Sequence, residues 1–272
     1  MQIGYFKMQK QRYFISLSYN GKAYHGWQIQ KNAITIQQIL NEKLSLKFRE
    51  PVELVGAGRT DTGVHAHFFV AHFDAYNKEL DNISIVNALN SFLPADITIY
   101  QIIKVKQNAH ARFDTIQRTY HYYLSSKKSS FFNNFYLNVP HLPDIVKMND
   151  AAKKLLTVSD FTSFVKLHSN NKTNICKVTY AKWKLISNEE IVFVITADRF
   201  LRNMVRAITG TLMNIGYAKL SSDIFLDTIN RKDRHFAALT VPAHGLFLYD
   251  IVYPDKIFMQ ENTILEKPKK LF

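Results

Sequence analysis

The stretch QRYFISLS, residues 11–18, returns in altered form as QRTYHYYLS, residues 117–125. In the first stretch apolar and polar side chains alternate, which is the period of a half-buried β-strand. After each stretch come a loop, an amphipathic helical pattern and then further strand patterns. The echo predicts an α+β protein of two similar halves, 1–107 and 108–272, whose sheets join.

Periodicity places further elements inside these halves. Residues 36–48 carry apolar positions at helical spacing behind a capping-box pattern, and residues 84–93 predict a second helix that Pro94 stops. The hydrophobic segments VELVGAG and HFFVAHFDA predict strands, so RTDTGVH, residues 59–65, lies on the connection between them. Later in the chain, KVTYAKWKLIS and IVFVITA predict a hairpin and GLFLYDIVY predicts a last strand.

One predicted helix is rich in arginine. DRFLRNMVRAITGTLMNIG, residues 198–216, has an aspartate suited to capping its start and a glycine suited to ending it. At about 100° per residue, its large apolar side chains share one face, and Arg199, Arg202 and Arg206 cluster on the opposite arc. An arginine stripe without acidic partners four residues on favours contact with phosphate or with a buried carboxylate over a solvated outer face.

The stretch GAGRTDTGVHAH, residues 56–67, concentrates polar chemistry in one turn. Its glycines permit a tight backbone path and the close approach of a ligand. Asp61 fits a simple turn residue paired with Arg59, but among cationic groups it is also held ionised as a nucleophile or general base. His65 and His67 share a face of a strand, as a pair of metal ligands would; we favour a histidine that packs under the loop, since no Glu or Cys follows at ligand spacing.

Composition narrows the class of partner. Lys and Arg number 35 against 22 Asp and Glu, a formal charge of +13, which favours a polyanion, and the 13% of aromatic residues offers stacking faces for unpaired bases. The one cysteine, Cys176, excludes an intramolecular disulfide and is expected to be buried. We find no apolar run long enough for a membrane span and no secretory signal after either possible start, Met1 or Met8, so we expect a cytoplasmic protein.

Several spaced motifs resemble, in order, those of the TruA-type tRNA pseudouridine synthases. The motifs are YNGKAYHGWQIQKNAITIQQILNEKL, GAGRTDTGVHAHFFVAHF, ALNSFLPADITI, HARFDTIQRTYHYYL, SDFTSF, FLRNMVRAITGTLMNIG and VPAHGLFLYDIVY. Two departures are visible: Asn20 stands where the family usually has an aspartate, and Ala109 where an aromatic residue commonly precedes the HARF element. Both lie outside the expected reacting centre, so they bear on local packing.

The resemblance implies an isomerase that converts uridine to pseudouridine at positions 38, 39 and 40 of the tRNA anticodon stem-loop. It implies base flipping around an ionised aspartate, no cofactor and no metal, and a homodimer. The implied fold has two halves whose largely antiparallel sheets join into a central sheet, with helices on one face and an RNA-binding cleft on the other. Two alternatives stand beside it: a non-catalytic tRNA-binding protein, and a metal-dependent nuclease that uses Asp61, His65 and His67.

The same resemblance assigns roles to single residues. It makes Asp61 the catalytic aspartate, Arg206 the basic residue that pairs with it, and Tyr120 the active-site tyrosine that stacks on the uracil. Arg59 resembles the arginine that helps to extrude the target nucleotide, and Leu246 fits either the apolar pocket wall or the ordinary core. The other residues that we expect to bind RNA are Arg112, Arg118, Arg199 and Arg202.

Overall fold

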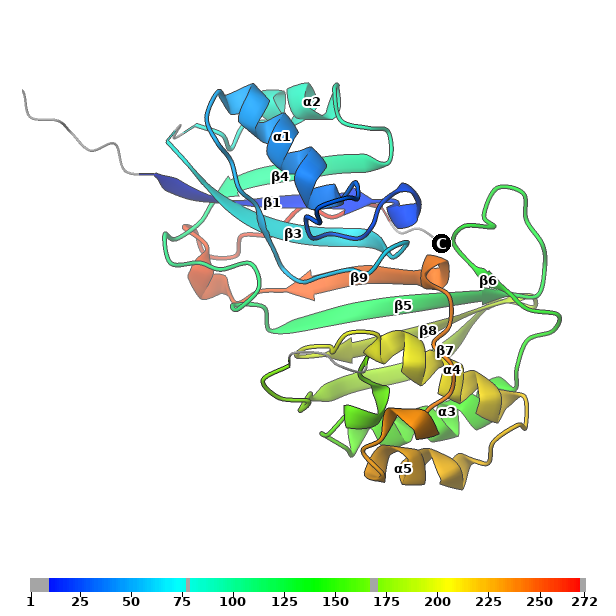
Figure 1. The fold of residues 1–272 in the computed structure, drawn as a ribbon. Coiled ribbons are helices and arrows are strands. Elements are labelled where there is room, and N and C mark those ends of the chain that lie inside the picture. Colours follow the sequence, from blue (N-terminus) through cyan, green and yellow to red (C-terminus); the bar gives the residue numbers. More distant parts are fainter. Residues whose placement is uncertain (1–9, 77–78, 167–170, 270–272) are drawn as a thin grey trace, which may run out of the picture. The chain divides into compact units, whose positions relative to one another are not determined.

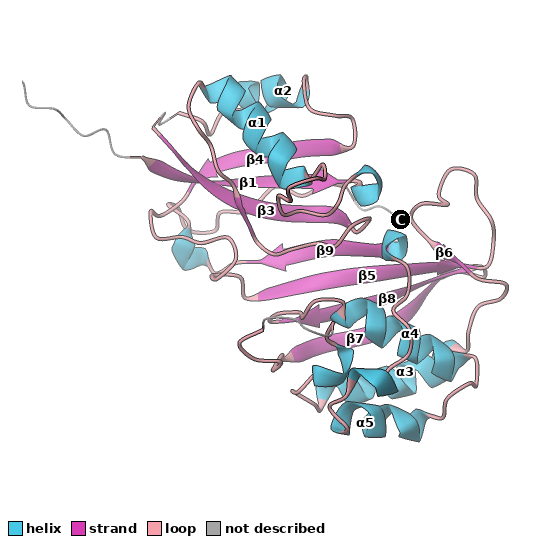
Figure 2. Cartoon of the chain, viewed as in Figure 1, coloured by secondary structure: helices cyan, strands magenta, loops and turns pink. Residues whose placement is uncertain are grey.

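The computed structural model describes residues 10–76, 79–166 and 171–269 (Figure 1). Helices and strands are combined in two compact units, so the protein is α+β as predicted (Figure 2). The first unit comprises Met1–Thr60, Ala66–Thr115 and Tyr253–Phe272, and the second comprises Asp61–His65 and Ile116–Val252. The two possible starts, Met1 and Met8, lie outside the described residues.

The first unit is built on an antiparallel sheet in the order β4-β1-β3, with the short β2 paired to β3. Helices α1 and α2 pack beside each other on this sheet (Figure 1). Its elements are β1 (Gln11–Tyr19), a 3-10 turn (Gly21–Ala23), α1 (Ile36–Phe48), β2 (Val55–Gly56), β3 (His65–Ala75), α2 (Ile83–Asn90), β4 (Ile97–Lys104) and a second 3-10 turn (Asp255–Ile257).

The predicted helix at 36–48 is confirmed to the residue. Thr35 caps it, because its hydroxyl oxygen accepts a hydrogen bond from the Gln38 amide at 3.3 Å. Helix α2 ends earlier than predicted, at Asn90. The Asn90 side chain both donates to and accepts from the backbone of Ile99 in β4, and the amides of Ser91 and Leu93 still donate to the carbonyls of Asn87 and Leu89 in a last turn before Pro94.

Aromatic packing fills the core of the first unit. The Trp27 and Phe69 rings stack with centroids 4.1 Å apart. A Cβ atom at Gly56 would lie 2.6 Å from the Trp27 ring, so this first glycine of the loop motif serves close packing.

The second unit has a sheet in the order β9-β5-β8-β7, antiparallel throughout except for the short β6, which pairs parallel to β5. Helices α3, α4 and α5 pack together on this sheet. Its strands are β5 (Gln117–Ser125), β6 (Leu137–Asn138), β7 (Val178–Ser187), β8 (Glu190–Ala197) and β9 (Leu246–Val252). Its helices are α3 (Ile145–Lys153), α4 (Met204–Gly216) and α5 (Ser222–Asn230), with 3-10 turns at Lys154–Leu156, Thr162–Phe164, Arg234–Phe236 and Ala243–Gly245.

Apart from the short β6 of the second unit, the two units share one connectivity: strand, helix, two strands, helical segment, strand. In each unit the first strand lies between the last strand and the strand that precedes the second helical segment. These first strands are β1 and β5, the two stretches whose sequences echo each other. The prediction of two similar, largely antiparallel α+β halves is therefore confirmed.

The prediction of a helix from residue 198 is wrong for residues 198–203, because α4 begins only at Met204. The Asp198 carboxylate accepts hydrogen bonds from the amides of Lys177 and Arg199, at 2.8 and 2.7 Å, instead of capping a helix. Asn203 then takes a left-handed conformation, with φ of 65°, and α4 follows. The arginine stripe is thus divided between an irregular segment and the first turn of α4.

Gly216 also differs from its predicted role. It is the last residue of α4 rather than the residue beyond it, and the left-handed position that ends the helix is Ala218. A Cβ atom at Gly216 would lie 2.7 Å from Pro143 and 2.8 Å from Met148 of α3. The glycine is therefore needed where α4 crosses α3.

Two expectations from composition can be compared with the structure. Cys176 is buried as predicted, and this burial raises the pKa of its thiol to about 12. Among the described helices, none has the length and apolar character needed to cross a membrane.

Candidate active site

Two arginines converge on the carboxylate of Asp61 within the second unit. Arg202 Nε lies 3.5 Å from one carboxylate oxygen and Arg206 Nη1 lies 3.9 Å from the other. Both distances exceed those of ordinary hydrogen bonds, so the cations neutralise the carboxylate without occupying its lone pairs in short bonds. The Asp61 side chain is 29% exposed and is therefore open to a ligand.

Arg206 is held in place by the segment that precedes β9. Its Nε donates to the Val241 carbonyl at 2.7 Å, and the Val241 amide donates back to the Arg206 carbonyl at 3.4 Å. We call residues 237–241 the strap. One turn further along α4, a Cβ atom at Gly210 would lie 2.3 Å from the Leu239 carbonyl oxygen, so glycine permits the strap to lie against the helix.

Turn geometry fixes the loop that carries Asp61. The Val64 amide donates to the Asp61 carbonyl at 3.1 Å, and Gly63 has a φ of 77°, a conformation that favours glycine. In the first unit, the preceding Thr60 is anchored by its hydroxyl, which lies 2.8 Å from the Tyr19 hydroxyl, and by its carbonyl, which accepts from the Trp27 amide. The aspartate is thus carried on a backbone that is restrained on both sides.

His65 packs under this loop, as we expected. Its Nε2 lies 3.0 Å from the Asn134 carbonyl and 3.1 Å from the His244 carbonyl, and two acceptors require that this nitrogen carry the proton. Burial lowers the pKa of His65 to about 4, although both carbonyls raise it, so the ring is neutral at pH 7. The ring also stacks on Phe247 at 4.6 Å, so His65 ties the end of the Asp61 loop to β9.

The histidine pair does not form the core of a metal site within the part of the chain that the structure describes. There, no group of three or more His, Cys, Asp and Glu side chains comes together in a way that could hold a metal ion. His67 is buried in β3.

Tyr120 lies in β5 and is buried, with its ring edge-to-face against Phe200 at 5.0 Å. Burial raises the pKa of its phenol to about 12; the charge of Arg118 lowers this pKa and the charge of Asp61 raises it. The phenol therefore keeps its proton at neutral pH. Its ring is suited to apolar packing rather than to proton abstraction.

Of the predicted residues, Asp61, Tyr120 and Arg206 belong to one region of the second unit, together with Arg202. Arg202, which we expected to bind RNA as part of the arginine stripe, has the guanidinium that lies nearer to Asp61. The stripe itself was the signal, because such an arginine cluster favours contact with a carboxylate as well as with phosphate. The strap was missed, because no motif in the sequence marks a hydrogen bond between a helix and a residue 35 positions later.

The remaining predicted residues are distributed more widely. Arg118 Nη1 donates to the Asp198 carbonyl at 2.9 Å, and Arg199 follows Asp198 in the irregular segment before α4. In the first unit Arg59 and Arg112 are exposed. Leu246 is buried at the start of β9, where Tyr122 of β5 is its register partner.

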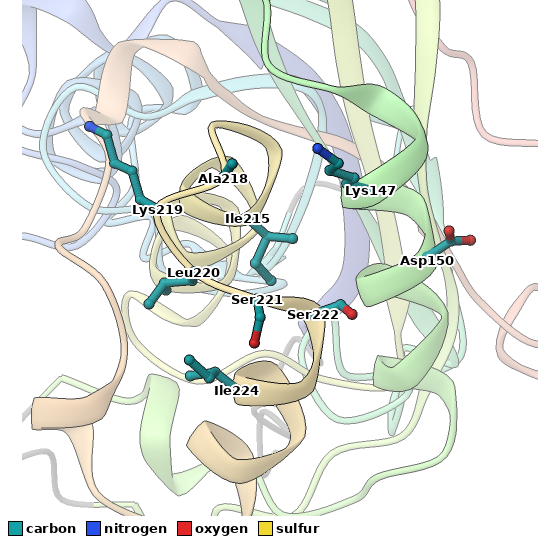
Figure 3. A pocket seen from close by; sticks show the side chains of 9 residues that line it. All are labelled: Lys147, Asp150, Ile215, Ala218, Lys219, Leu220, Ser221, Ser222 and Ile224. Atoms are coloured by element: carbon teal, nitrogen blue, oxygen red, sulfur yellow. The ribbon is translucent and has the colours of Figure 1, made fainter.

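A cavity of about 440 Å³ opens elsewhere in the second unit, between α3, the end of α4 and the start of α5 (Figure 3). Ile215, Leu220 and Ile224 provide its apolar wall, and Lys147 and Asp150 line it from α3. None of the predicted site residues lines this cavity. It is therefore separate from the group around Asp61.

Comparison with known proteins identifies the class. The model of a family described as tRNA pseudouridine synthase matches residues 15–114 and 151–254 of this chain. The chain belongs to this family.

Individual relatives agree with the family match. The chain is 49% identical to tRNA pseudouridine synthase A of Parabacteroides distasonis, in an alignment that covers 92% of this chain and 99% of the relative. It is also 49% identical to the protein of that name from Bacteroides fragilis, over 92% of this chain and all of the relative. With the Porphyromonas gingivalis protein of the same name it shares 50% identity over 91% of this chain and 99% of the relative.

Proposed function

We propose that this protein isomerises uridine to pseudouridine at positions 38, 39 and 40 of the tRNA anticodon stem-loop, with the Asp61 carboxylate as the reacting group and without a cofactor. The observation that carries the proposal is the pair of guanidinium groups on Asp61, one beside each oxygen, around a carboxylate that stays open to solvent. The family match and the relatives named tRNA pseudouridine synthase A support the choice of substrate and reaction.

The reaction needs little beyond such a carboxylate. The N1–C1′ bond of the nucleotide breaks, the uracil turns, a C5–C1′ bond forms, and the proton from C5 passes to solvent while N1 gains one. No electrons enter or leave, so no redox group takes part. Asp61 can attack C1′, add to C6 of the base, or remove a proton from C2′, and each route requires an ionised carboxylate with an available lone pair.

The neighbouring residues take supporting roles in this proposal. Arg206 and Arg202 orient the carboxylate and face its two oxygens with positive charge. Tyr120, whose phenol stays protonated, packs against the extruded uracil. Arg59, two residues before Asp61 and exposed, fills the place that the extruded base leaves in the RNA stack.

The tRNA-binding surface extends beyond the reacting centre in our proposal. Further contacts come from Arg112, Arg118 and Arg199, and Leu246 forms part of the apolar wall of the pocket that binds the RNA. The formal charge of +13 supplies the attraction to phosphate. We also propose that the protein forms a homodimer with a basic cleft between the subunits. We propose that it acts in the cytoplasm, and the single cysteine of the sequence supports this compartment.

One experiment tests the reaction directly. The purified protein is incubated with a uridine-containing anticodon stem-loop in the presence of a metal chelator, and pseudouridine is mapped chemically. Pseudouridine at positions 38 to 40 is the expected result. Tight binding without any product would instead favour the non-catalytic binding protein, and RNA cleavage that the chelator abolishes would favour the nuclease.

A further inference from the structure

The second unit presents two adjacent phenylalanines to solvent, Phe131 and Phe132, whose exposed fractions are 84% and 47%. They lie in residues 126–136, which we call the aromatic loop and which joins β5 to β6. Lys127 and Lys128 precede them and are also exposed. A single exposed apolar residue is ordinary, but two neighbouring rings beside two lysines form a combined apolar and cationic surface that suits a specific partner.

The aromatic loop has an ordered tip. The Ser129 hydroxyl oxygen accepts hydrogen bonds from the amides of Phe131 and Phe132, at 3.3 and 3.2 Å. The Phe135 amide then donates to the Phe132 carbonyl at 2.9 Å and closes a turn. Because the backbone beneath the rings is already fixed, a partner that contacts them pays little ordering entropy.

The base of the loop is anchored in the core. Tyr136 is buried, and its ring packs edge-to-face on Tyr123 of β5 at 5.5 Å. Tyr123 packs in turn on Phe247 of β9 at 5.3 Å. The exposed rings therefore extend from a rigid aromatic cluster.

The aromatic loop is also tied to the segment that carries Asp61. The Asn134 carbonyl accepts the hydrogen bond from His65 Nε2 at 3.0 Å, and the Phe135 ring packs edge-to-face on His65 at 5.2 Å. Since three residues of extended chain span at most about 10 Å, Phe131 stays close to Asn134 and hence to His65. An RNA that occupies the Asp61 site is therefore within reach of this tip.

The chemistry of the loop selects among polyanionic partners. Between residues 126 and 143 the sequence contains no Asp or Glu, and Lys127 pairs only loosely with the exposed Glu189, at 3.3 Å. Phenyl rings stack on the faces of unpaired bases, which a continuous double helix does not offer, and lysines bind the adjoining phosphates. The loop also lies between the two stretches that the family model matches, 15–114 and 151–254.

From these observations we infer that the aromatic loop binds unpaired nucleotides of the anticodon loop, with Phe131 and Phe132 stacking on bases and Lys127 and Lys128 contacting phosphate. This inference rests on the proposed function and extends its tRNA-binding surface. The aromatic loop would add a contact with RNA bases that the arginines around Asp61 do not provide. It also lies outside the sequence motifs that resemble the family.

Alanine substitutions at the tip test the inference. Phe131→Ala, Phe132→Ala and the double variant are titrated against a labelled anticodon stem-loop at fixed salt, alongside thermal unfolding. We expect each single change to weaken binding about 5- to 100-fold, the usual effect of removing a base-stacking ring. The Phe131→Trp variant, which keeps an aromatic ring, should bind the stem-loop with wild-type affinity. The Phe131→Leu variant, which loses the ring, should bind it more weakly. Leu185→Ala, which removes another apolar side chain that is 62% exposed, is the matched control and should leave affinity unchanged.

Two further readouts separate the possible outcomes. The fluorescence of the new tryptophan in the Phe131→Trp variant should be quenched when the stem-loop is added. A fully paired duplex of equal length should not quench it. Unchanged RNA affinity in the double alanine variant would overturn the inference, and so would dissociation of a dimer at unchanged affinity, since the loop would then contact a second copy. If the wild-type protein neither binds nor modifies tRNA, the proposed function itself fails; if it does both, only the loop assignment is at stake.

Discussion

Replacing Gly210 by alanine tests whether the strap positions Arg206. The new Cβ atom would lie 2.3 Å from the Leu239 carbonyl oxygen, well inside van der Waals contact. That oxygen belongs to backbone, so it can move only if the strap moves with it. The strap would then leave α4 at the point where Val241 holds the Arg206 side chain.

The magnitude follows from two opposing effects. In an unobstructed helix, alanine is more favourable than glycine by about 1 kcal/mol. Displacing the strap breaks the bond from Arg206 Nε to Val241, worth about 1.5–3 kcal/mol for a charged donor, and the bond from the Ala238 amide to the Thr211 hydroxyl, worth about 0.5–1.5 kcal/mol. The loss exceeds the gain, so we expect Gly210→Ala to lower the free energy of unfolding by about 1–3 kcal/mol.

The assay combines stability with chemistry. Urea unfolding gives the change in free energy, and single-turnover pseudouridine formation at saturating tRNA gives the rate. The rate should fall while tRNA affinity stays within a few fold, because Arg206 is displaced and the basic surface is not. Asn214→Ala, one turn further along α4, is the control and should change neither quantity by much. A Gly210→Ala protein that is more stable than the wild type and equally active would refute the role of the strap.

Three other outcomes are expected. Arg206→Lys keeps the positive charge but loses the Nε donor to Val241, so the single-turnover rate should fall about 10- to 100-fold, and an undiminished rate would show that charge alone suffices. Burial lowers the pKa of both His65 and His72 to about 4 from the usual 6.5, so the unfolded chain binds more protons between these values. The contribution of the two histidines to stability should therefore fall as the pH drops from 6.5 to 4, by at most about 3.4 kcal/mol per histidine, and should level off below pH 4. Urea unfolding at pH 4.5 and 7 measures this change, and a His72→Asn variant should show a shallower fall. Raising salt should weaken tRNA binding with a log-log slope of about 0.7–0.9 per neutralised phosphate, whereas a flat response would mean that the excess charge faces away from RNA.

The elements that the sequence predicts well are those decided locally. The helix at 36–48 has its cap, Thr35, and its buried face within one window, so periodicity suffices. The sequence of β1 alternates and that of β5 echoes it, which also reveals the repeated connectivity. The loop around Asp61 is recognisable because its glycines and charged residues are contiguous.

What the sequence does not predict depends on distant partners. Asp198 accepts from the amide of Lys177, 21 residues away, and this bond prevents the helix start that the local pattern favours. The two carbonyls that fix the tautomer of His65 come from positions 69 and 179 residues further along the chain. Such bonds leave no periodic or motif signal, because only the folded backbone brings their atoms together.

The two departures from the family pattern fit their surroundings in the first unit. The Asn20 side-chain oxygen accepts a hydrogen bond from the Lys22 amide at 3.1 Å, a role that an aspartate would fill equally. Ala109 is buried, and its carbonyl accepts from Arg12 Nη1 at 3.0 Å, a bond that does not depend on the side chain. Both substitutions are therefore accommodated by local structure.

The most direct test of the account is the rate of tritium release from tRNA that carries uridine tritiated at C5, measured with Asp61→Asn under single-turnover conditions. Joining C5 to C1′ expels the C5 hydrogen, so release reports the isomerisation itself. We predict no release above background, with tRNA affinity within a few fold of the wild type, because the amide has the shape of the carboxylate but neither its charge nor its basicity. Release at a rate comparable to that of the wild type would contradict the assignment of the reaction to Asp61.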